Sequence, residues 1–376
     1  MFEPVDLAKA LANKRISRRT FLMGMAGSAA LGILGSGIAS CSSGAAPTPT
    51  AAGAGASAAP KYAGRTLRLM LNGGYYEETV KAAVIEPFER KYGARVETTP
   101  ANSGEMLTRM RAEKSSPTVD LSFIDDMVAV SAIGEGLVEK IDAANVPNMK
   151  DLDKKAIDPN GYGPIIHSNI TNFAYNKELV KVEPPKSWAE LWDAKYKDML
   201  AVSAITLTPG VLLLLQATML NGGSYENIDP GFAALKRLRP NIRRWIKNIG
   251  EVRPAVDKEP VVGVFGLAVW MDEIKKGIPL VTINPEEGAH ALPATGQIVK
   301  GTKNKDLAEL FLNEYLSPES QAAISTKMYF KTFNTKTQLP ADVKQIMPSQ
   351  LQVFDPAKIA KYREEWTARW LREMGA

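Results

Sequence analysis

Cysteine and histidine are almost absent from this 376-residue chain, which contains Cys41, His167 and His290 and no other residue of either type. A single cysteine excludes an internal disulfide, a Cys-x-x-Cys redox pair and a cysteine-rich zinc site. Two histidines leave few residues for metal binding or for histidine-based catalysis. We therefore expect no metal and no cofactor.

The chain also lacks the excess of basic residues that is typical of nucleic-acid-binding proteins. Its 46 Lys and Arg residues are matched by 41 Asp and Glu residues, which gives a net charge of +5. Without residues 1–40 the balance is 41 to 39, a net charge of +2. We expect no nucleic-acid partner. The 45% hydrophobic content is enough to bury a sizeable core, which excludes a wholly disordered chain.

The first forty residues have the features of an export signal. Arg18 and Arg19 directly precede an apolar run, residues 21–38, that contains no acidic residue, and this arrangement resembles a twin-arginine signal peptide. The alternative is a retained transmembrane helix, but five glycines within the run lower both its helix propensity and its apolarity. We predict that residues 1–40 direct export.

Cys41 follows this signal directly. Residues 38–41, Ile-Ala-Ser-Cys, resemble a lipobox, in which the cysteine thiol becomes acylated. Residues 42–60 are all Ser, Gly, Ala, Pro or Thr, a composition that buries too little apolar area to fold. We predict a lipidated cysteine and a flexible linker over residues 41–61. The protein would then be held by its lipid in the periplasm or at the outer face of the cytoplasmic membrane.

From residue 62 onward, short β-rich runs alternate with amphipathic helical runs, which favours an α/β fold. The first runs predict two successive β-α-β units with a parallel sheet, built from strands at 65–71, 95–99 and 120–124 and helices at 77–92, 104–113 and 127–135. Later runs predict strands at 170–176, 199–202, 261–269, 280–283 and 290–299 and helices at 209–220, 304–316 and 356–373.

The length of the folded part indicates two lobes. About 315 residues follow the linker, which is more than one hydrophobic core usually organises. We predict that each lobe is a mixed, mostly parallel sheet flanked by helices, with hinge strands and a cleft between the lobes. The first lobe is expected to comprise residues 62–169 and 290–320, and the second lobe residues 170–289 and 321–376.

Ligands of open α/β sheets bind at the carboxyl ends of the strands, and this rule selects candidates in the first lobe. After the first predicted strand, Asn72, Gly74 and Tyr75 offer an amide side chain, an accessible backbone N–H and an aromatic ring to a ligand. The alternative is that the glycine pair at 73–74 only forms a turn. After the third predicted strand, Asp125 and Asp126 meet a helix start. One acid can cap the helix, and the other is then free to bind a cation or a hydroxyl group.

The second lobe supplies two further candidate segments, each between a predicted strand and the helix that follows it. Trp270 and Asp272 follow a predicted strand, and an indole beside a carboxylate can hold an amine. A core tryptophan and a capping aspartate would give the same pattern. Thr206 precedes the helix that starts near Pro209, where hydroxyl groups and free amide donors favour an anion or a carbonyl oxygen, although helix capping by Thr208 also explains this segment.

Motifs of enzyme chemistry are missing. Gly-x-Ser-x-Gly, Ser-x-x-Lys, His-Glu-x-x-His and the phosphate-binding Gly-x-x-x-x-Gly-Lys-Ser/Thr do not occur. We therefore expect a binding protein and not an enzyme. Two alternatives are an exported lyase or hydrolase that uses Asp125, Asp126 or Asp272 as general base, and a surface adhesin or scaffold with a broad apolar patch.

Seven short segments are informative as an ordered set: Asn72-Gly-Gly-Tyr75, Glu86-Pro-Phe88-Glu89, Phe123-Ile-Asp125-Asp126, Pro185-Lys-Ser-Trp188-Ala-Glu-Leu-Trp192, Asn221-Gly-Gly, Ala268-Val-Trp270-Met-Asp272 and Pro285-Glu-Glu-Gly288. This set resembles the extracellular solute-binding proteins of ABC importers, in particular the spermidine/putrescine-binding type. The resemblance implies a two-lobed type II periplasmic-binding fold that closes around one small solute and delivers it to a membrane permease. It also implies that Tyr75, Asp125, Trp270 and Asp272 line the cleft. We expect the protein to be a monomer.

The class of solute stays open at this level. Polyamine binders are expected to present acids from both lobes, because each buried ammonium group needs a paired charge. Residues 203–215 contain no acid, and Ala294 stands where many relatives carry an aspartate. A polyamine and a neutral or zwitterionic, amino-acid-like solute are therefore both candidates.

Overall fold

The structure is a computed structural model that describes residues 61–375. The predicted export signal with Arg18 and Arg19, the predicted lipidation site Cys41 and nearly all of the predicted linker lie outside these residues. Within residues 61–375, no helix combines the length and the apolar character that a membrane crossing requires.

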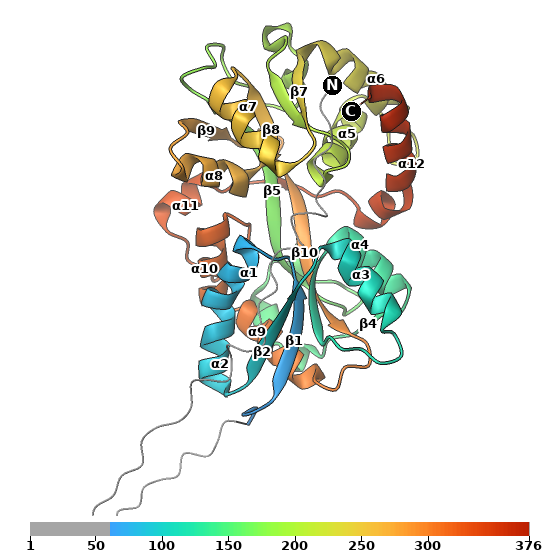
Figure 1. The fold of residues 1–376 in the computed structure, drawn as a ribbon, viewed down its shortest axis with the longest axis vertical. Helices are drawn as coiled ribbons and strands as arrows, with labels where there is room; N and C mark the ends of the chain where they lie inside the picture. Colours follow the sequence, from blue (N-terminus) through green and yellow to red (C-terminus); the bar gives the residue numbers. More distant parts are fainter. Residues whose placement is uncertain (1–60, 376) are drawn as a thin grey trace, which may run out of the picture. The chain divides into compact units, whose positions relative to one another are not determined.

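One path of hydrogen-bonded strands runs through the described chain in the order β2-β1-β3-β10-β5-β8-β6-β7 (Figure 1). At one end, parallel pairs join β1 to β2 and β1 to β3; at the other end, parallel pairs join β6 to β7 and β6 to β8. Between them, β5 and β10 are antiparallel to each other and to β8 and β3, respectively. The strands on this path are β1 (Thr66–Leu71), β2 (Arg95–Pro100), β3 (Leu121–Asp125), β5 (Ile165–Asn176), β6 (Leu200–Ser203), β7 (Ile242–Ile246), β8 (Val262–Gly266) and β10 (Ala289–Val299), while β4 (Val138–Glu139), β9 (Leu280–Ile283) and β11 (Leu351–Gln352) pair with β5 or β10.

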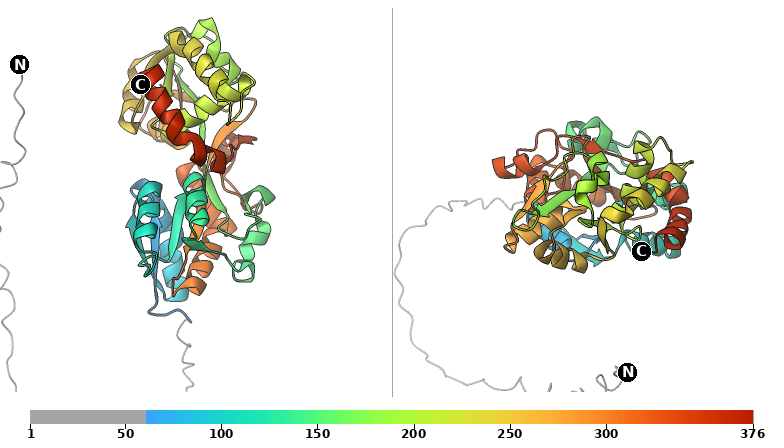
Figure 2. Two further views of the ribbon diagram at one scale, coloured as in Figure 1. Left: turned by 90° about the vertical axis from the view of Figure 1, so that its right-hand side faces the viewer. Right: turned by 90° about the horizontal axis from the view of Figure 1, so that it is seen from above.

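Helices surround both ends of this path, and the long strands β5 and β10 join the two groups (Figures 1 and 2). The helices of the first group are α1 (Tyr75–Val80), a π-helical segment (Lys81–Ile85), α2 (Glu86–Tyr92), α3 (Ser103–Ala112), α4 (Asp126–Gly134), α9 (Lys305–Tyr315) and α10 (Pro318–Met328). Those of the second group are α5 (Thr208–Leu220), α6 (Asp229–Leu238), α7 (Val252–Lys258), α8 (Leu267–Lys275) and α12 (Pro356–Met374). The segment between α10 and α12 contains α11 (Ala341–Ile346).

Side-chain alternation along the strands builds a separate core at each end. In β1, Leu67, Leu69 and Leu71 enter one hydrophobic cluster, whereas Met70, which points to the other face of the sheet, enters a second one. We call the elements around these clusters the first lobe. The second lobe surrounds a different cluster, which includes the fully buried Trp188.

Helix α5 illustrates how composition determines position. Its segment from Val211 to Leu215 consists only of Val and Leu, and every residue from Gly210 to Thr218 is buried. A helix that is apolar on all sides is stable only inside a lobe, and Pro209 in its first turn is compatible with a helix start.

The predicted two-lobed α/β fold is confirmed, with parallel pairing inside each lobe and antiparallel pairing along the two crossing strands. One boundary is wrong. Residues 321–330 were expected in the second lobe, but Ile324, Met328 and Phe330 are buried in the first-lobe cluster. The reason is local, because α10 follows α9 after a very short turn and packs against both α9 and α1.

Candidate functional site

The register of the hinge strands places the ends of β3 and β8 opposite each other. Asp125, the last residue of β3, pairs with Ala294 of β10, which in turn pairs with His167 of β5. Gly266, the last residue of β8, pairs with Thr171 of β5. Four residues of extended strand separate the level of His167 from that of Thr171, a length of roughly 13 Å. We call the region between these strand ends the interlobe site.

Four helices begin at this site, directly after strands of both lobes. They are α1 and α4 in the first lobe and α5 and α8 in the second lobe, and the residue that directly precedes each of them makes no side-chain capping hydrogen bond. The first N–H groups of a helix lack partners inside the helix, and they form its positive end. The site therefore offers backbone donors to an anionic or carbonyl group.

Asp125 supplies negative charge at the same place. Its backbone N–H donates to Ser103 Oγ at 3.1 Å. Burial raises the pKa of the Asp125 carboxyl, while the Ser103 hydroxyl and the Arg363 guanidinium act in the opposite direction. The Asp125 charge also contributes to the raised pKa of Tyr76. Asp125 thus lies within electrostatic reach of Tyr76 on α1 and Arg363 on α12.

Asp126 has a different environment from its neighbour. Its Oδ1 accepts the Met127 backbone N–H at 2.7 Å, so this acid serves the start of α4. Burial raises the Asp126 pKa to about 7, and the nearby Asp125 charge adds to this effect. Asp126 also lines a groove of about 420 Å³ beside α4, together with Ile157 and Val353.

Asn72, Gly74 and Tyr75 lie together at the turn between β1 and α1, and all three are exposed. Gly74 has a φ of 69°, a left-handed conformation that favours glycine. Tyr75 is 56% exposed and is the most exposed aromatic side chain of residues 61–375. Its ring is therefore free to contact a solute.

Thr206 lies in the turn between β6 and α5. Its side chain is exposed, and the turn is fixed by a backbone bond from Leu207 N–H to Ala204 O at 3.0 Å. The residue that starts α5 is Thr208, and its hydroxyl makes no capping bond. The sequence-based alternative, capping by Thr208, is thus wrong for this structure.

The corner at Trp270 and Asp272 differs from the prediction. Strand β8 ends at Gly266, three residues earlier than expected, and α8 carries Trp270 into its second turn. Trp270 is 1% exposed, packs against Phe265 and fills the space above Gly263. The Asp272 side chain is 57% exposed and forms an ion pair with Lys276. The structure therefore does not bring this indole and this carboxylate together as an amine site.

Arg363 is a candidate residue that the sequence interpretation missed. It lies on α12, and its guanidinium makes no hydrogen bond or ion pair with any residue from 61 to 375. Burial lowers the pKa of Arg363, while the Asp125 charge acts in the opposite direction. Helix α12 anchors in the second-lobe core through Ile359 and Trp366 and also contacts α4 of the first lobe. A signal was present in the sequence, because Arg363 lies four residues after Ile359 and three before Trp366, on the apolar side of the helix.

Metal binding has no support in the described part of the chain. Residues 61–375 contain no group of three or more His, Cys, Asp or Glu side chains that could hold a metal ion. The chemistry of the interlobe site consists of one half-buried carboxylate, one unpaired guanidinium, an exposed aromatic ring and four helix starts.

Comparison with known proteins identifies relatives of similar sequence. The gamma-aminobutyric acid-binding protein of Pseudomonas aeruginosa is 23% identical over 308 residues, which cover 78% of this chain and 84% of that protein. The spermidine/putrescine-binding periplasmic protein of Escherichia coli is 25% identical over 271 residues, which cover 69% of this chain and 76% of that protein.

Solved structures show the same fold. An ABC transporter protein from Clostridium perfringens superimposes with a TM-score of 0.72 at 24% identity, over 82% of this chain and 99% of that one. An extracellular solute-binding protein from Bordetella parapertussis gives a TM-score of 0.75 at 22% identity, over 83% and 99% of the two chains. Residues 83–348 match the family described as bacterial extracellular solute-binding protein. The chain therefore belongs to this family, as a solute-binding protein of an ABC transporter and not an enzyme.

Proposed function

We propose that the protein captures a small zwitterionic, amino-acid-like solute at the interlobe site, with the amine of the solute on Asp125 and its carboxylate near Arg363. The observation that carries this proposal is the placement of two opposite charges on the two lobes: Asp125 directly precedes α4 of the first lobe, and the unpaired Arg363 guanidinium lies on α12, which is anchored in the second-lobe core and packs against α4. A solute with one charge of each sign, held between them, would neutralise both groups.

The second-lobe edge argues against a solute with two ammonium groups. The segments that follow β6 and β8, residues 204–207 and 267–270, contain no acid. Asp272 is the next acid along α8, and Lys276 already neutralises it. A buried second ammonium would lack a paired charge, which costs several kcal/mol by the general cost of burying an unpaired ion.

The helix starts favour a carboxylate at the second-lobe end. Both α5 and α8 present uncapped N–H groups there, and α5 is 13 residues long. Tyr75 would cover the solute from the first lobe with its exposed ring. The relatives named for gamma-aminobutyric acid and for spermidine or putrescine bind amines, which agrees with a role for Asp125, and the zwitterionic relative agrees with the charges of both lobes.

Calorimetric titration of the purified chain with gamma-aminobutyric acid, putrescine and spermidine tests this proposal. We expect saturable binding of the amino acid, weaker binding of both polyamines, and at least about a tenfold loss for Asp125→Asn. Asp153→Asn is the control, because Asp153 is an exposed acid of the first lobe outside the site. Tight polyamine binding that Arg363→Gln leaves unchanged would favour a polyamine binder, and the absence of binding to all three solutes would contradict the proposal.

Capture is proposed to occur by lobe closure about β5 and β10. A solute that contacts both lobes only in the closed arrangement shifts the equilibrium toward that arrangement. Small-angle X-ray scattering should show a smaller radius of gyration with saturating solute, and a smaller decrease with Asp125→Asn at the same solute concentration. An unchanged radius at full occupancy would exclude closure.

Export and anchoring complete the proposal. The chain would leave the cytoplasm through its Arg18-Arg19 signal, acquire lipid on Cys41 and deliver its solute to an ABC permease in the same membrane. Cys41→Ala should release the protein from the membrane fraction, and Arg18→Lys combined with Arg19→Lys should retain it in the cytoplasm. Mass spectrometry of the mature N-terminus would identify the lipid on Cys41 directly.

A further inference from the structure

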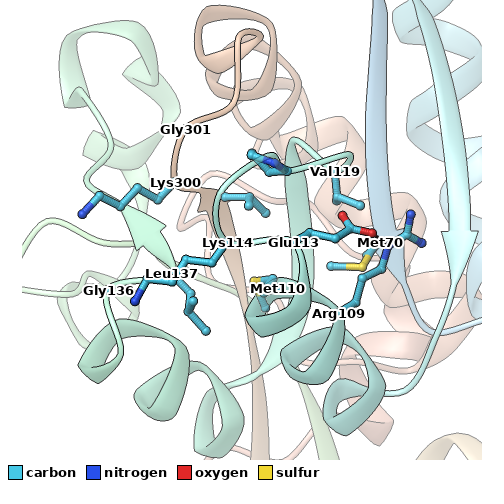
Figure 3. A pocket seen from close by; sticks show the side chains of 12 residues that line it. Met70, Arg109, Met110, Glu113, Lys114, Val119, Gly136, Leu137, Lys300 and Gly301 are labelled. Atoms are coloured by element: carbon cyan, nitrogen blue, oxygen red, sulfur yellow. Dashed lines mark hydrogen bonds and ion pairs between the residues drawn. The ribbon is translucent and has the colours of Figure 1, made fainter.

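A cavity of about 230 Å³ lies in the first lobe, away from the interlobe site. It is bordered by the end of α3, the residues that lead into β3, the turn after α4 and the end of β10 (Figure 3). Val119 lies at the cavity and Asp125 at the interlobe site, and the six residues of extended chain between them correspond to roughly 20 Å. The cavity is therefore separate from the proposed solute site.

The wall of this cavity is apolar. Met70, Met110, Val119, Leu137 and Val299 all line it, and each is almost completely buried. An apolar wall of this kind binds hydrocarbon in preference to water. An engineered cavity of about 150 Å³ accepts benzene in another protein, so the space here suits a chain or ring of about eight to ten heavy atoms.

The charges at the rim are unbalanced. Glu113 is the one acid of the lining; Arg109 neutralises it at 2.8 Å, and the Thr118 N–H and hydroxyl groups donate hydrogen bonds to it. Although burial acts in the opposite direction, the Thr118 and Arg109 hydrogen bonds hold the Glu113 pKa below its usual range. Two further cations remain, Lys114 and Lys300.

Neither lysine forms an ion pair within residues 61–375, although the Lys114 charge contributes to the lowered pKa of Glu135, whose carboxylate is bound by Arg111. Lys114 Nζ donates to the Glu135 backbone oxygen at 3.0 Å, and the Lys300 ammonium makes no hydrogen bond or ion pair with any residue from 61 to 375. Figure 3 shows both ammonium groups on one side of the cavity and the Arg109–Glu113 pair on the other. The cavity thus combines an apolar interior with positive charge on one side of its rim.

We propose that this cavity is a second binding site, which takes a small amphipathic monocarboxylate with its apolar part against Met70 and Met110 and its carboxylate between Lys114 and Lys300. The occupant differs from the transported solute, because the interlobe site offers a carboxylate and this one offers none that is free. Occupation would not require lobe closure, since all of the lining belongs to the first lobe.

Methyl NMR of the full chain labelled at methionine tests this site, with octanoate as the probe. Met70 and Met110 report on the cavity, and Met219 on α5 of the second lobe is the internal reference for non-specific binding. We expect saturable shifts of Met70 and Met110 with no shift of Met219. Octylamine, which has the same chain and the opposite charge, should leave all three unshifted at equal concentration.

Variants at the rim complete the test. Lys114→Gln combined with Lys300→Gln should weaken octanoate binding about tenfold, because it removes both charges that are proposed to hold the carboxylate. The fold should tolerate the change, since both positions are exposed. Lys303→Gln is the matched control, since Lys303 is a nearby exposed lysine that does not line the cavity. Asp125→Asn should leave octanoate binding intact, which separates this site from the interlobe site. No shift of Met70 and Met110, equal shifts with octylamine, or unweakened binding by the double variant would each overturn the proposal.

Discussion

His290 lies flat against Trp188 where β10 crosses between the lobes, with ring centroids 3.7 Å apart and an angle of 1° between the planes. Trp188 donates its indole N–H to Gly288 O at 2.9 Å, and His290 Nε2 is 3.1 Å from Gln216 Oε1. Burial lowers the His290 pKa to about 3, so the ring is neutral and donates through Nε2 to Gln216. The stack therefore ties a hinge strand to the second-lobe core.

Gln216→Leu should lower the free energy of unfolding by about 1–3 kcal/mol, because it leaves the buried His290 N–H without an acceptor. Urea denaturation followed by circular dichroism measures this loss. Adding His290→Phe to the variant removes the donor as well and should recover part of the stability. A single variant as stable as the natural chain would show that the bond contributes nothing.

Asp126 should make the folded chain more stable in mild acid. The pKa of Asp126 in the folded chain is about 7, above its ordinary value of 3.8, because burial favours the protonated carboxyl. The contribution of Asp126 to the free energy of unfolding is therefore fully present below about pH 3.8 and is lost as the pH rises through about 7. Asp126→Asn lacks this contribution. The difference in unfolding free energy between the natural chain and the variant should therefore shift by up to about 4 kcal/mol in favour of the natural chain between pH 8 and pH 4. A difference that stays constant across this range would contradict the burial of this carboxyl.

Tyr75→Ala should weaken solute binding severalfold and leave stability within about 0.5 kcal/mol, because the side chain is 56% exposed. Tyr75→Phe keeps the ring and should bind nearly as well as the natural chain. Isothermal titration gives the affinities and thermal melting the stabilities. Equal binding by the Ala and Phe variants would mean that the ring does not contact the solute.

Arg363→Gln should weaken binding of the amino acid about tenfold and should not weaken binding of putrescine, which has no carboxylate. Arg363→Lys keeps the charge but loses the planar guanidinium with its paired N–H donors. Its affinity for the amino acid should lie between those of the natural chain and Arg363→Gln. Competition titrations with both solutes measure the ratio of affinities. A parallel loss for both solutes would indicate that Arg363 supports the α12–α4 contact and not the carboxylate.

Gly263→Ala should lower the free energy of unfolding by about 1–3 kcal/mol, because the added Cβ would lie 2.5 Å from the Trp270 ring. Gly266→Ala is the matched control in the same strand, since its added Cβ meets only ordinary contacts at 3.9 Å and beyond. Trp270 fluorescence should respond to the first change and not to the second. Equal stability of the two variants would place Trp270 elsewhere than in the core.

Local patterns in the sequence determined the elements and the class of fold. Alternation in segments such as Leu67 to Leu71, and the uninterrupted apolar run from Val211 to Leu215, indicate strands and a buried helix without knowledge of any partner, because these periodicities reflect burial directly. The rule that ligands lie at strand ends also selected Tyr75 and Asp125, and the structure places both at the interlobe site.

Tertiary structure alone decided which of the candidate side chains are free to bind a solute. Trp270 and Asp272 satisfied the same sequence rule, but an earlier end of β8 buries the first, and Lys276 neutralises the second. Arg363, about 290 residues after Tyr75 in the sequence, comes within reach of Asp125 only because α12 packs on one lobe and touches the other. Strand and helix patterns depend on neighbours a few residues away, whereas the charge balance of the site depends on long-range packing that no local pattern encodes.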